Sequence, residues 1–304
     1  MPKSKVGRFT TPAGREVFDA AYEAGLRTLP DPSAVHDVGT AFGTVRAYTF
    51  GTAPGSPLVL LHGRGGTAIS WKPNIAALAA HRTVHVLDLL GEPGRSVQTE
   101  PIRDADDQAA WLAATLEGLD VGAAHLVGVS NGGWSAVNIA VRHPERLASI
   151  SLLDPINTFA RLPLGAILRT IPTLIPFMAD WAMPRFLSWV DGRGTVPEGD
   201  PVGEVIAAAL RHYRMAVPMP ALFSDDELRS IDRPVLAVIA GRSVMHDPAR
   251  AMDRTDLIPH VDAEIWPEAT HAVSGQCAEQ VNARILRFVE ESQNRPSGRD
   301  AEPT

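Results

Sequence analysis

A serine stands at the centre of the pentapeptide Gly-Val-Ser-Asn-Gly at 128–132. The apolar, β-branched run at 125–129 predicts a buried strand, and the pattern at 134–142 predicts a helix. A G-x-S-x-G sequence between a strand and a helix is typical of a nucleophilic serine, here Ser130, on a turn so tight that only glycine fits on either side. The turn also places the backbone N–H of Asn131 at a helix N-terminus, where it can donate to an oxyanion. The alternative is a glycine-rich turn that contains a surface serine.

A serine hydroxyl is a poor nucleophile near neutral pH, so Ser130 needs a base, and the base needs an orienting acid. The base that serves a G-x-S-x-G serine is normally a histidine further along the chain. His271 has this position, because it follows an apolar segment at 261–266 and a short polar loop, and precedes the last helical pattern. His62 is the other candidate near the site, but it precedes Ser130, and we expect it to hold the turn in which it lies.

The turn after the apolar run at 58–61 carries His62, Gly63 and Arg64. We expect this turn to supply a second oxyanion donor, the backbone N–H of Arg64. For the Arg64 side chain, exposure to solvent is favoured over contact with a substrate. His62 and Gly63 are expected to border the substrate pocket, together with Trp71.

These residues need a scaffold that brings distant loops together, and the rest of the chain predicts one. Short apolar runs indicate buried strands, and helical patterns separate them; the runs cover 58–61, 84–87, 147–153, 235–240 and 261–266. Apolar strands separated by helices predict a mostly parallel sheet with helices on both faces, which is an α/β fold. A hairpin-like segment at 35–50 precedes this sheet.

The alternation stops between residues 155 and 226. This stretch is too long and too apolar for a bare loop, so we interpret it as a helical cap inserted after the strand that ends at Asp154. Its aromatic side chains would form the roof of the substrate pocket; they are Phe159, Phe177, Trp181 and Trp189. The alternative is that these side chains pack only among themselves and contribute little to the site.

The predicted organisation has four parts. Residues 1–34 form a helical extension, 35–154 and 227–290 form the core, 155–226 form the cap, and the polar tail at 291–304 is disordered. In the extension, an amphipathic helix at 13–29 is expected to dock through one face. The residues of that face are Val17, Ala20, Ala21, Ala24 and Leu29.

The composition argues against several classes of protein. The net charge is −7 with no basic run, which argues against nucleic acid as a partner. No apolar stretch follows Met1 and no segment holds 18 uninterrupted apolar residues, so we expect a cytoplasmic protein without a membrane span. The single cysteine, Cys277, allows no internal disulfide, and no cysteine cluster indicates a metal site. The oligomeric state stays open, with a homodimer among the alternatives.

Several of these segments together resemble the α/β-hydrolase superfamily. They are the pentapeptide at 128–132, the His62-Gly63 turn, the segment at 88–96 and the late Thr270-His271 pair. The resemblance runs from about residue 44 to residue 289 and is least specific in the cap.

More narrowly, the sequence is similar to bacterial carboxylesterases of the naproxen-esterase type. The segments that carry this likeness are the N-terminal helix and residues 71–75, 223–230 and 244–248. The likeness implies hydrolysis of small-molecule carboxylic esters with a hydrophobic acyl part, without a cofactor. In similar sequences Asp88 braces the following loop and is not catalytic, and we expect the same here.

The acid is where this chain departs from the superfamily, whose members usually carry it shortly after the strand placed here at 235–240. The three residues that follow Gly241 are not acidic. Asp247 comes next, but Asp-Pro at this point is typical of a helix N-cap with proline at the first helical position. Asp154 ends the strand at 147–153, at the carboxyl edge of the sheet, and some superfamily members keep their acid there. The alternative for Asp154 is a turn residue before a proline. We predict Asp154 as the acid, with Asp247 as the alternative.

Three functions remain in view. The first is a serine carboxylesterase that works through an acyl-enzyme with Ser130, His271 and Asp154. The second is a lactonase or a hydrolase of a biosynthetic intermediate that uses the same residues. The third belongs to another class, a ligand-binding homologue with weak turnover, which the missing acid after Gly241 keeps in view. The fold alone would license many reactions, so the reaction class depends on the site.

Overall fold

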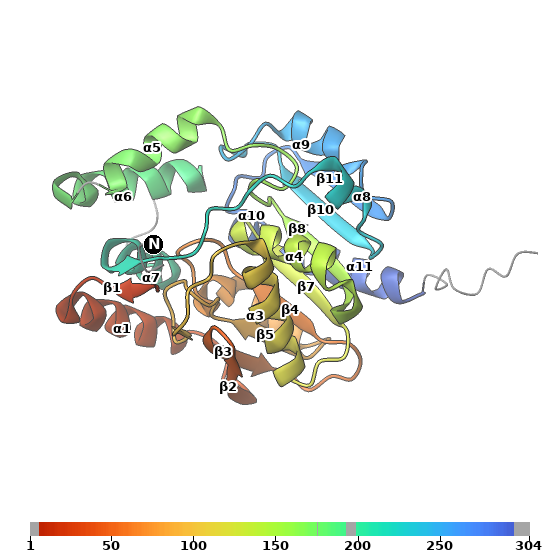
Figure 1. The fold of residues 1–304 in the computed structure, drawn as a ribbon, viewed down its shortest axis with the longest axis horizontal. Helices are drawn as coiled ribbons and strands as arrows, with labels where there is room; N and C mark the ends of the chain where they lie inside the picture. The colour runs from red at the N-terminus through yellow and green to blue at the C-terminus, as the bar shows by residue number, and fades with distance from the viewer. Residues whose placement is uncertain (1–5, 175, 193–198, 295–304) are drawn as a thin grey trace, which may run out of the picture.

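The computed structural model describes residues 6–174, 176–192 and 199–294, and its centre is a mostly parallel sheet (Figure 1). The sheet has the strand order β11-β10-β8-β7-β4-β5-β3-β2. Its strands are β2 (Ala34–Thr40), β3 (Gly43–Phe50), β4 (Leu58–Leu61), β5 (Val84–Leu87), β7 (Ala124–Val129), β8 (Leu147–Leu153), β10 (Val235–Ala240) and β11 (Val261–Trp266). The pairs from β5 to β11 are parallel, whereas β3 pairs antiparallel with β2, with β5 and with the short β6 (Val97–Gln98).

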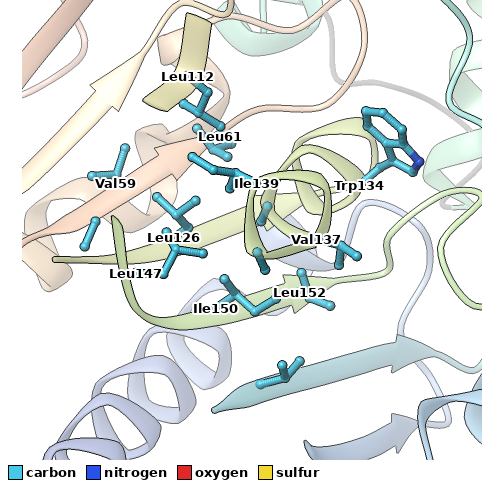
Figure 2. Close-up of a cluster of buried hydrophobic side chains, with 14 of the residues drawn as sticks. Val59, Leu61, Leu112, Leu126, Trp134, Val137, Ile139, Leu147, Ile150 and Leu152 are labelled. Atoms are coloured by element: carbon cyan, nitrogen blue, oxygen red, sulfur yellow. The ribbon is translucent and has the colours of Figure 1, made fainter. Parts of the chain in front are cut away.

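Side chains alternate between two apolar layers along each central strand, as a sheet covered on both faces requires. Val59 and Leu61 of β4 face one layer, and Leu58 and Leu60 face the other. The first layer includes α3 (Ala105–Gly118) and α4 (Asn131–Arg142). Figure 2 shows how Leu126 of β7 and side chains of α4 and β8 meet in this layer. The second layer includes α2 (Lys72–Ala79) and α11 (Ala278–Asn294).

The predicted fold class is confirmed, because helices cover both faces of a mostly parallel sheet. The helix ends differ from the prediction. Helix α4 begins at Asn131 and not near Trp134, because the helix starts directly from the tight turn that holds Ser130. The polar tail was predicted to be disordered from residue 291, but α11 continues to Asn294. The remaining tail residues lie outside the described part of the chain.

The N-terminal helix α1 (Pro12–Leu26) docks on the body, and the face that it buries is only partly the one predicted. Its buried residues are Gly14, Phe18, Tyr22 and Gly25, whereas Val17 is 52% exposed. The two aromatic side chains bury more area than the alanines that suggested the other face. Helix α1 packs against α7 (Pro201–His212), and the short strands β1 (Arg8–Phe9) and β9 (Tyr213–Arg214) pair beside it.

The segment between β8 and β10 holds the helices α5 (Leu164–Leu174), α6 (Pro176–Asp191), α7 and α8 (Asp225–Arg229). In Figure 1, α5 and α6 form an antiparallel pair set apart from the sheet and its covering helices. This pair reaches the body through a small apolar cluster that includes Phe186 and Trp189 of α6 and Met245 of the loop after β10. The division into extension, core and cap stays a prediction.

Two short helices flank the loops that follow β10 and β11. They are α9 (Pro248–Thr255) and α10 (Val273–Gln276). The loops that precede them begin at the carboxyl ends of the parallel strands β10 and β11. Within the described residues, no helix combines the length and the apolar character that crossing a bilayer requires.

Candidate active site

Ser130 occupies a strained turn between β7 and α4. Its φ is 55° and its ψ is −116°, an unusual conformation for a residue with a side chain. A Cβ at Gly128 would lie 2.2 Å from the carbonyl oxygen of Gly132, and one at Gly132 would lie 2.1 Å from that of Leu61. Both glycines are therefore required by close backbone approach, as the sequence predicted. The backbone O of Ser130 accepts from the N–H of Trp134, which ties the turn to the first turn of the helix.

The turn should not tolerate a methyl group at position 132. We expect Gly132→Ala to lower the free energy of unfolding by about 2–3 kcal/mol, because the neighbouring backbone has to move. Gly122→Ala is the matched control, since a Cβ there meets no atom within 4 Å and its effect should stay within about 0.5 kcal/mol. Urea denaturation of the two variants measures the difference. Equal stabilities would show that the turn is less tight than its geometry indicates.

The structure brings Ser130, His271 and Asp154 into one chain of hydrogen bonds. The Ser130 Oγ lies 2.9 Å from Nε2 of His271, and Nδ1 of the same ring lies 2.6 Å from Oδ2 of Asp154. Because an ionised carboxylate only accepts, the ring hydrogen belongs on Nδ1, which leaves Nε2 to accept from the serine hydroxyl. The sequence predicted these three residues as nucleophile, base and orienting acid, and the geometry suits those roles.

Asp154 is fully buried at the end of β8, and four donors contact its carboxylate. Oδ1 accepts from the backbone N–H of Ala240 at 2.9 Å and lies 2.8 Å from Nε2 of His246. Oδ2 accepts from the Ser243 hydroxyl at 2.6 Å as well as from His271. Burial acts to raise the pKa of Asp154, but the hydrogen bonds and charges of His246 and His271 outweigh it and hold this pKa well below its ordinary value. The carboxylate is therefore ionised and in place at neutral pH.

Asp247, the alternative acid, has another role in the structure. It is the N-cap of α9, and its Oδ1 accepts from the backbone N–H groups of Ala249 and Arg250. Its side chain is 56% exposed, whereas that of Asp154 is fully buried beside His271. The geometry therefore favours Asp154 as the acid.

The turn after β4 lies directly against the serine. A Cβ on Gly63 would come within 3.2 Å of the Ser130 Cβ, so the backbone of this turn borders the nucleophile. The N–H groups of Arg64 and Asn131 donate to no protein acceptor in the described part of the chain, which leaves both available to an oxyanion. His62 is fully buried, and its Nε2 accepts from the N–H of Leu89 at 3.0 Å. His62 therefore holds the turn, as expected, and does not face an open pocket.

The Arg64 side chain is mostly buried and not solvent-exposed as favoured from the sequence. Only 25% of it is accessible, and its Nη1 lies 4.0 Å from Oε1 of Glu92. The other carboxylate oxygen of Glu92 accepts from the backbone N–H of Gly65 at 2.9 Å, so a buried acid braces the same turn. The turn is thus fixed from two sides, by His62 and by Glu92.

Asp88 braces the loop that follows β5, as the sequence resemblance implied. Its carboxylate accepts from Tyr22 Oη at 2.6 Å, from Arg95 N at 2.7 Å and from Ala68 N at 2.8 Å. It therefore connects the N-terminal helix, its own loop and the segment after β4. None of these contacts involves His271.

A pocket of about 450 Å³ opens between α6 and the loops after β10 and β11. Thr270, the residue before His271 in the sequence, lines it. Its other lining residues are Arg185, Ser188, Trp189, Gly192, Arg242 and Val244. Of the four aromatic residues expected in the roof, Trp189 lines this pocket.

The other predicted pocket residues have different surroundings. Trp71 is fully buried in the layer that contains α2, and Phe159 is 2% exposed in the layer that contains α3 and α4, so both belong to the core. Trp181 is 56% exposed, and the guanidinium of Arg185 stacks on its ring at 4.5 Å. The side chain of Phe177 lies outside what the structure describes.

Sequence reasoning missed two polar residues that contact the acid, Ser243 and His246. Both lie in the loop after Gly241, where an acid was sought and not found. The sequence signal is only their place just after the predicted strand at 235–240. The pairing of this strand, β10, with β8, which brings its end beside Asp154, is seen in the structure.

Known proteins resemble this chain in sequence and in fold. The model of the alpha/beta hydrolase family matches residues 58–284, and the chain belongs to this family. The uncharacterized carboxylesterase nap of Bacillus subtilis (strain 168) is 29% identical over 274 residues, which cover 88% of this chain and 90% of that protein. Carboxylesterase YbfK of the same organism is 28% identical over 283 residues, covering 90% and 93%.

Solved structures show the same likeness. The crystal structure of naproxen esterase (carboxylesterase NP) from B. subtilis superposes with a TM-score of 0.83 at 26% identity, covering 91% of this chain and 99% of that one. The structure of carboxylesterase CesB (YbfK) gives the same TM-score at 27% identity. The resemblance inferred from the sequence is thereby confirmed.

Proposed function

We propose that this protein is a serine carboxylesterase that works through an acyl-enzyme. The observation that carries the proposal is the continuous hydrogen-bond chain from the Ser130 Oγ through His271 to the buried Asp154. The carboxylesterases that resemble the chain over most of its length support the choice of ester as substrate. The fold alone would not, because the same fold supports many reactions.

In the proposed mechanism, Ser130 Oγ attacks the ester carbonyl while Nε2 of His271 takes its proton. Asp154 holds the ring through Nδ1 and stabilises the imidazolium that forms. The tetrahedral oxyanion accepts hydrogen bonds from the backbone N–H groups of Arg64 and Asn131. Its collapse breaks the bond to the alcohol, which leaves with the proton from His271. Water, activated by the same histidine, then attacks the acyl-enzyme and releases the acid and free Ser130.

A p-nitrophenyl ester tests the proposal directly. We expect a rapid release of p-nitrophenol equal to the amount of enzyme, followed by slower steady turnover if deacylation limits the rate. A phosphonate ester should label Ser130 and stop this turnover. Absence of both turnover and labelling would favour the ligand-binding alternative instead. That alternative arose from the missing acid after Gly241, and the contact of Asp154 with His271 supports the esterase over it.

The pocket beside Thr270 is the part of the site that we expect to set the acyl size. Trp189 lines this pocket, whereas Trp181, eight residues earlier on the same helix, is more than half exposed. Esters with bulky apolar acyl groups should be preferred over acetates, because each buried methylene contributes roughly 0.8 kcal/mol, about fourfold in kcat/KM.

Trp189→Ala should weaken this dependence on acyl size, and Trp181→Ala serves as the control that leaves it in place. The measurement is kcat/KM for a series of p-nitrophenyl esters from acetate to longer chains. An equal slope in all three proteins would show that the pocket does not receive the acyl group. The same series set beside a panel of lactones separates an esterase from a lactonase. The cytoplasmic location and the homodimer stay predictions, which cell fractionation and light scattering would test.

A further inference from the structure

A second histidine contacts the carboxylate that holds His271. Nε2 of His246 lies 2.8 Å from Oδ1 of Asp154, and the two side chains are 1% and 0% exposed. His271 takes the other oxygen, so two imidazole rings share one buried carboxylate. Nothing in the reaction described above requires the second ring.

The position of His246 is fixed by the loop that carries it. This loop leaves β10 beside Asp154, and the Ser243 hydroxyl contacts Oδ2 of the carboxylate and accepts from the backbone N–H of Met245. Met245 packs in the small apolar cluster with Ile156 and with Ala166 of α5. The packed loop therefore holds the ring of His246 against Asp154.

The hydrogen bond defines where the ring hydrogen is. The Asp154 carboxylate can only accept, so Nε2 of His246 must carry a hydrogen. Nδ1 of His246 is buried, and the hydrogen bond from Nε2 to Asp154 is the side-chain contact that anchors the ring. On the Asp154 side, Oδ1 would keep only the N–H of Ala240 if His246 were absent.

Among the described residues, the charges that act on this ring come from Asp154 and Asp247. Asp154 comes from the end of β8 and Asp247 follows His246 in its own loop, while His271 approaches the shared carboxylate from the loop after β11. Arg242, nearer the strand, is 63% exposed and pairs with Glu268. Burial acts to lower the pKa of His246, but the hydrogen bond and charge of Asp154, with smaller effects of the Asp247 backbone and charge, outweigh it and raise this pKa above its ordinary value.

We propose that His246 is a positioning residue that acts on His271 through Asp154. It holds the carboxylate in the plane that presents Oδ2 to His271, and its positive charge opposes a second positive charge on His271. Because both rings contact one carboxylate, a positive charge on His246 lies close to any positive charge on His271 and repels it. Because His271 must be unprotonated to accept the serine proton, His246 extends turnover towards lower pH. This inference rests on the proposed esterase activity.

Two variants separate the effect of the hydrogen bond to Asp154 from the effect of the charge on His246. His246→Gln keeps an amide donor at about the reach of Nε2 but cannot carry a charge, so its kcat on the alkaline side should stay near that of the wild type. Its acid limb in the profile of kcat/KM against pH should move up by about one pH unit, because a positive charge near His271 is lost. His246→Phe removes the donor as well and should lower kcat about 10- to 100-fold with KM nearly unchanged, the range seen when outer partners of metal-bound histidines are lost.

His260→Gln is the matched control, because His260 is an exposed histidine before β11, away from the shared carboxylate, and should leave the profile unchanged. A wild-type acid limb in His246→Gln overturns the proposal, and so does a wild-type kcat in His246→Phe. A purely structural role predicts a lower Tm with an unmoved acid limb. If His246→Phe does not fold, the acid limb of His246→Gln decides alone.

A readout without turnover keeps this inference separate from the esterase proposal. In a Ser130→Ala background, NMR of 13C-labelled histidines follows the protonation of the two rings directly. We expect the His271 ring to take up its proton at higher pH when His246 is replaced by glutamine. No ester turnover in the wild type would refute the proposed function, whereas an unmoved His271 titration would refute the role of His246.

Discussion

Ser130→Ala should reduce ester turnover on the order of 10⁴-fold or more while the fold stays intact. The Ser130 hydroxyl is the atom that Nε2 of His271 contacts at 2.9 Å, so its removal leaves the base without a nucleophile to activate. The turn itself depends on backbone contacts, because the Ser130 N–H donates to Leu153 O and its carbonyl accepts from Trp134. Alanine keeps these contacts and the Cβ that the strained turn already accommodates.

Turnover and labelling measure this expectation together. A phosphonate ester should label Ser130 in the wild type, and the variant should take no label. Ser135→Ala is the matched control, since that serine lies one turn further along α4 and its hydroxyl donates to the carbonyl of Asn131 in its own helix. Its turnover should stay within a few-fold of the wild type. Labelling of another serine, or full activity of Ser130→Ala, would place the nucleophile elsewhere.

The core strands were predictable because each one is a short apolar run with no competing pattern. The runs at 58–61, 84–87 and 235–240 have the bounds that the structure gives β4, β5 and β10. Helix starts were not predictable to the same degree. The residues 131–133, Asn-Gly-Gly, show no helical periodicity, and they are helical because the turn at Ser130 launches α4 directly.

Which face of an element is buried depends on neighbours that the local pattern does not name. In α1, the pattern of small residues suggested one face, but Phe18 and Tyr22 enter a cluster with Ile69 and residues of α7, far along the chain. Trp71 and Phe159 were expected at the substrate because they are aromatic and lie near the site in the sequence. Both fill the core, where large apolar side chains contribute most to stability.

The candidate site divides in the same way. Ser130, His271 and Asp154 could be proposed from the motif and from the succession of strands along the chain, because each residue follows a predictable strand. His246 and Ser243 could not, because they lie 92 and 89 residues from Asp154 and meet it only through the pairing of β10 with β8. Such pairing is a property of the sheet order, which the sequence alone left open.

Asp154→Asn should lower kcat roughly 10²- to 10⁴-fold with KM nearly unchanged; in serine proteases the corresponding change lowers turnover about 10⁴-fold. The reason lies in the four donors that contact the carboxylate. The fixed backbone N–H of Ala240 and the His246 ring face Oδ1, so the amide oxygen of an asparagine belongs there. Its NH₂ then faces both Nδ1 of His271 and the Ser243 hydroxyl. Of these two groups, only the hydroxyl can turn to accept while Nδ1 still carries its hydrogen. The His271 hydrogen is driven to Nε2, and the ring can no longer accept the proton of Ser130.

Asp247→Asn is the control that isolates this effect, because asparagine caps a helix about as well as aspartate does. The Asp247 carboxylate contacts the first N–H groups of α9 and is largely exposed, so turnover should stay within about twofold of the wild type. Steady-state kinetics on one p-nitrophenyl ester, with circular dichroism to verify folding, compare the two variants. Loss of turnover in Asp247→Asn with full activity in Asp154→Asn would assign the acid to the loop after β10. Full activity in both would mean that Ser130 and His271 work as a dyad, and the buried carboxylate would then serve the fold and not the reaction.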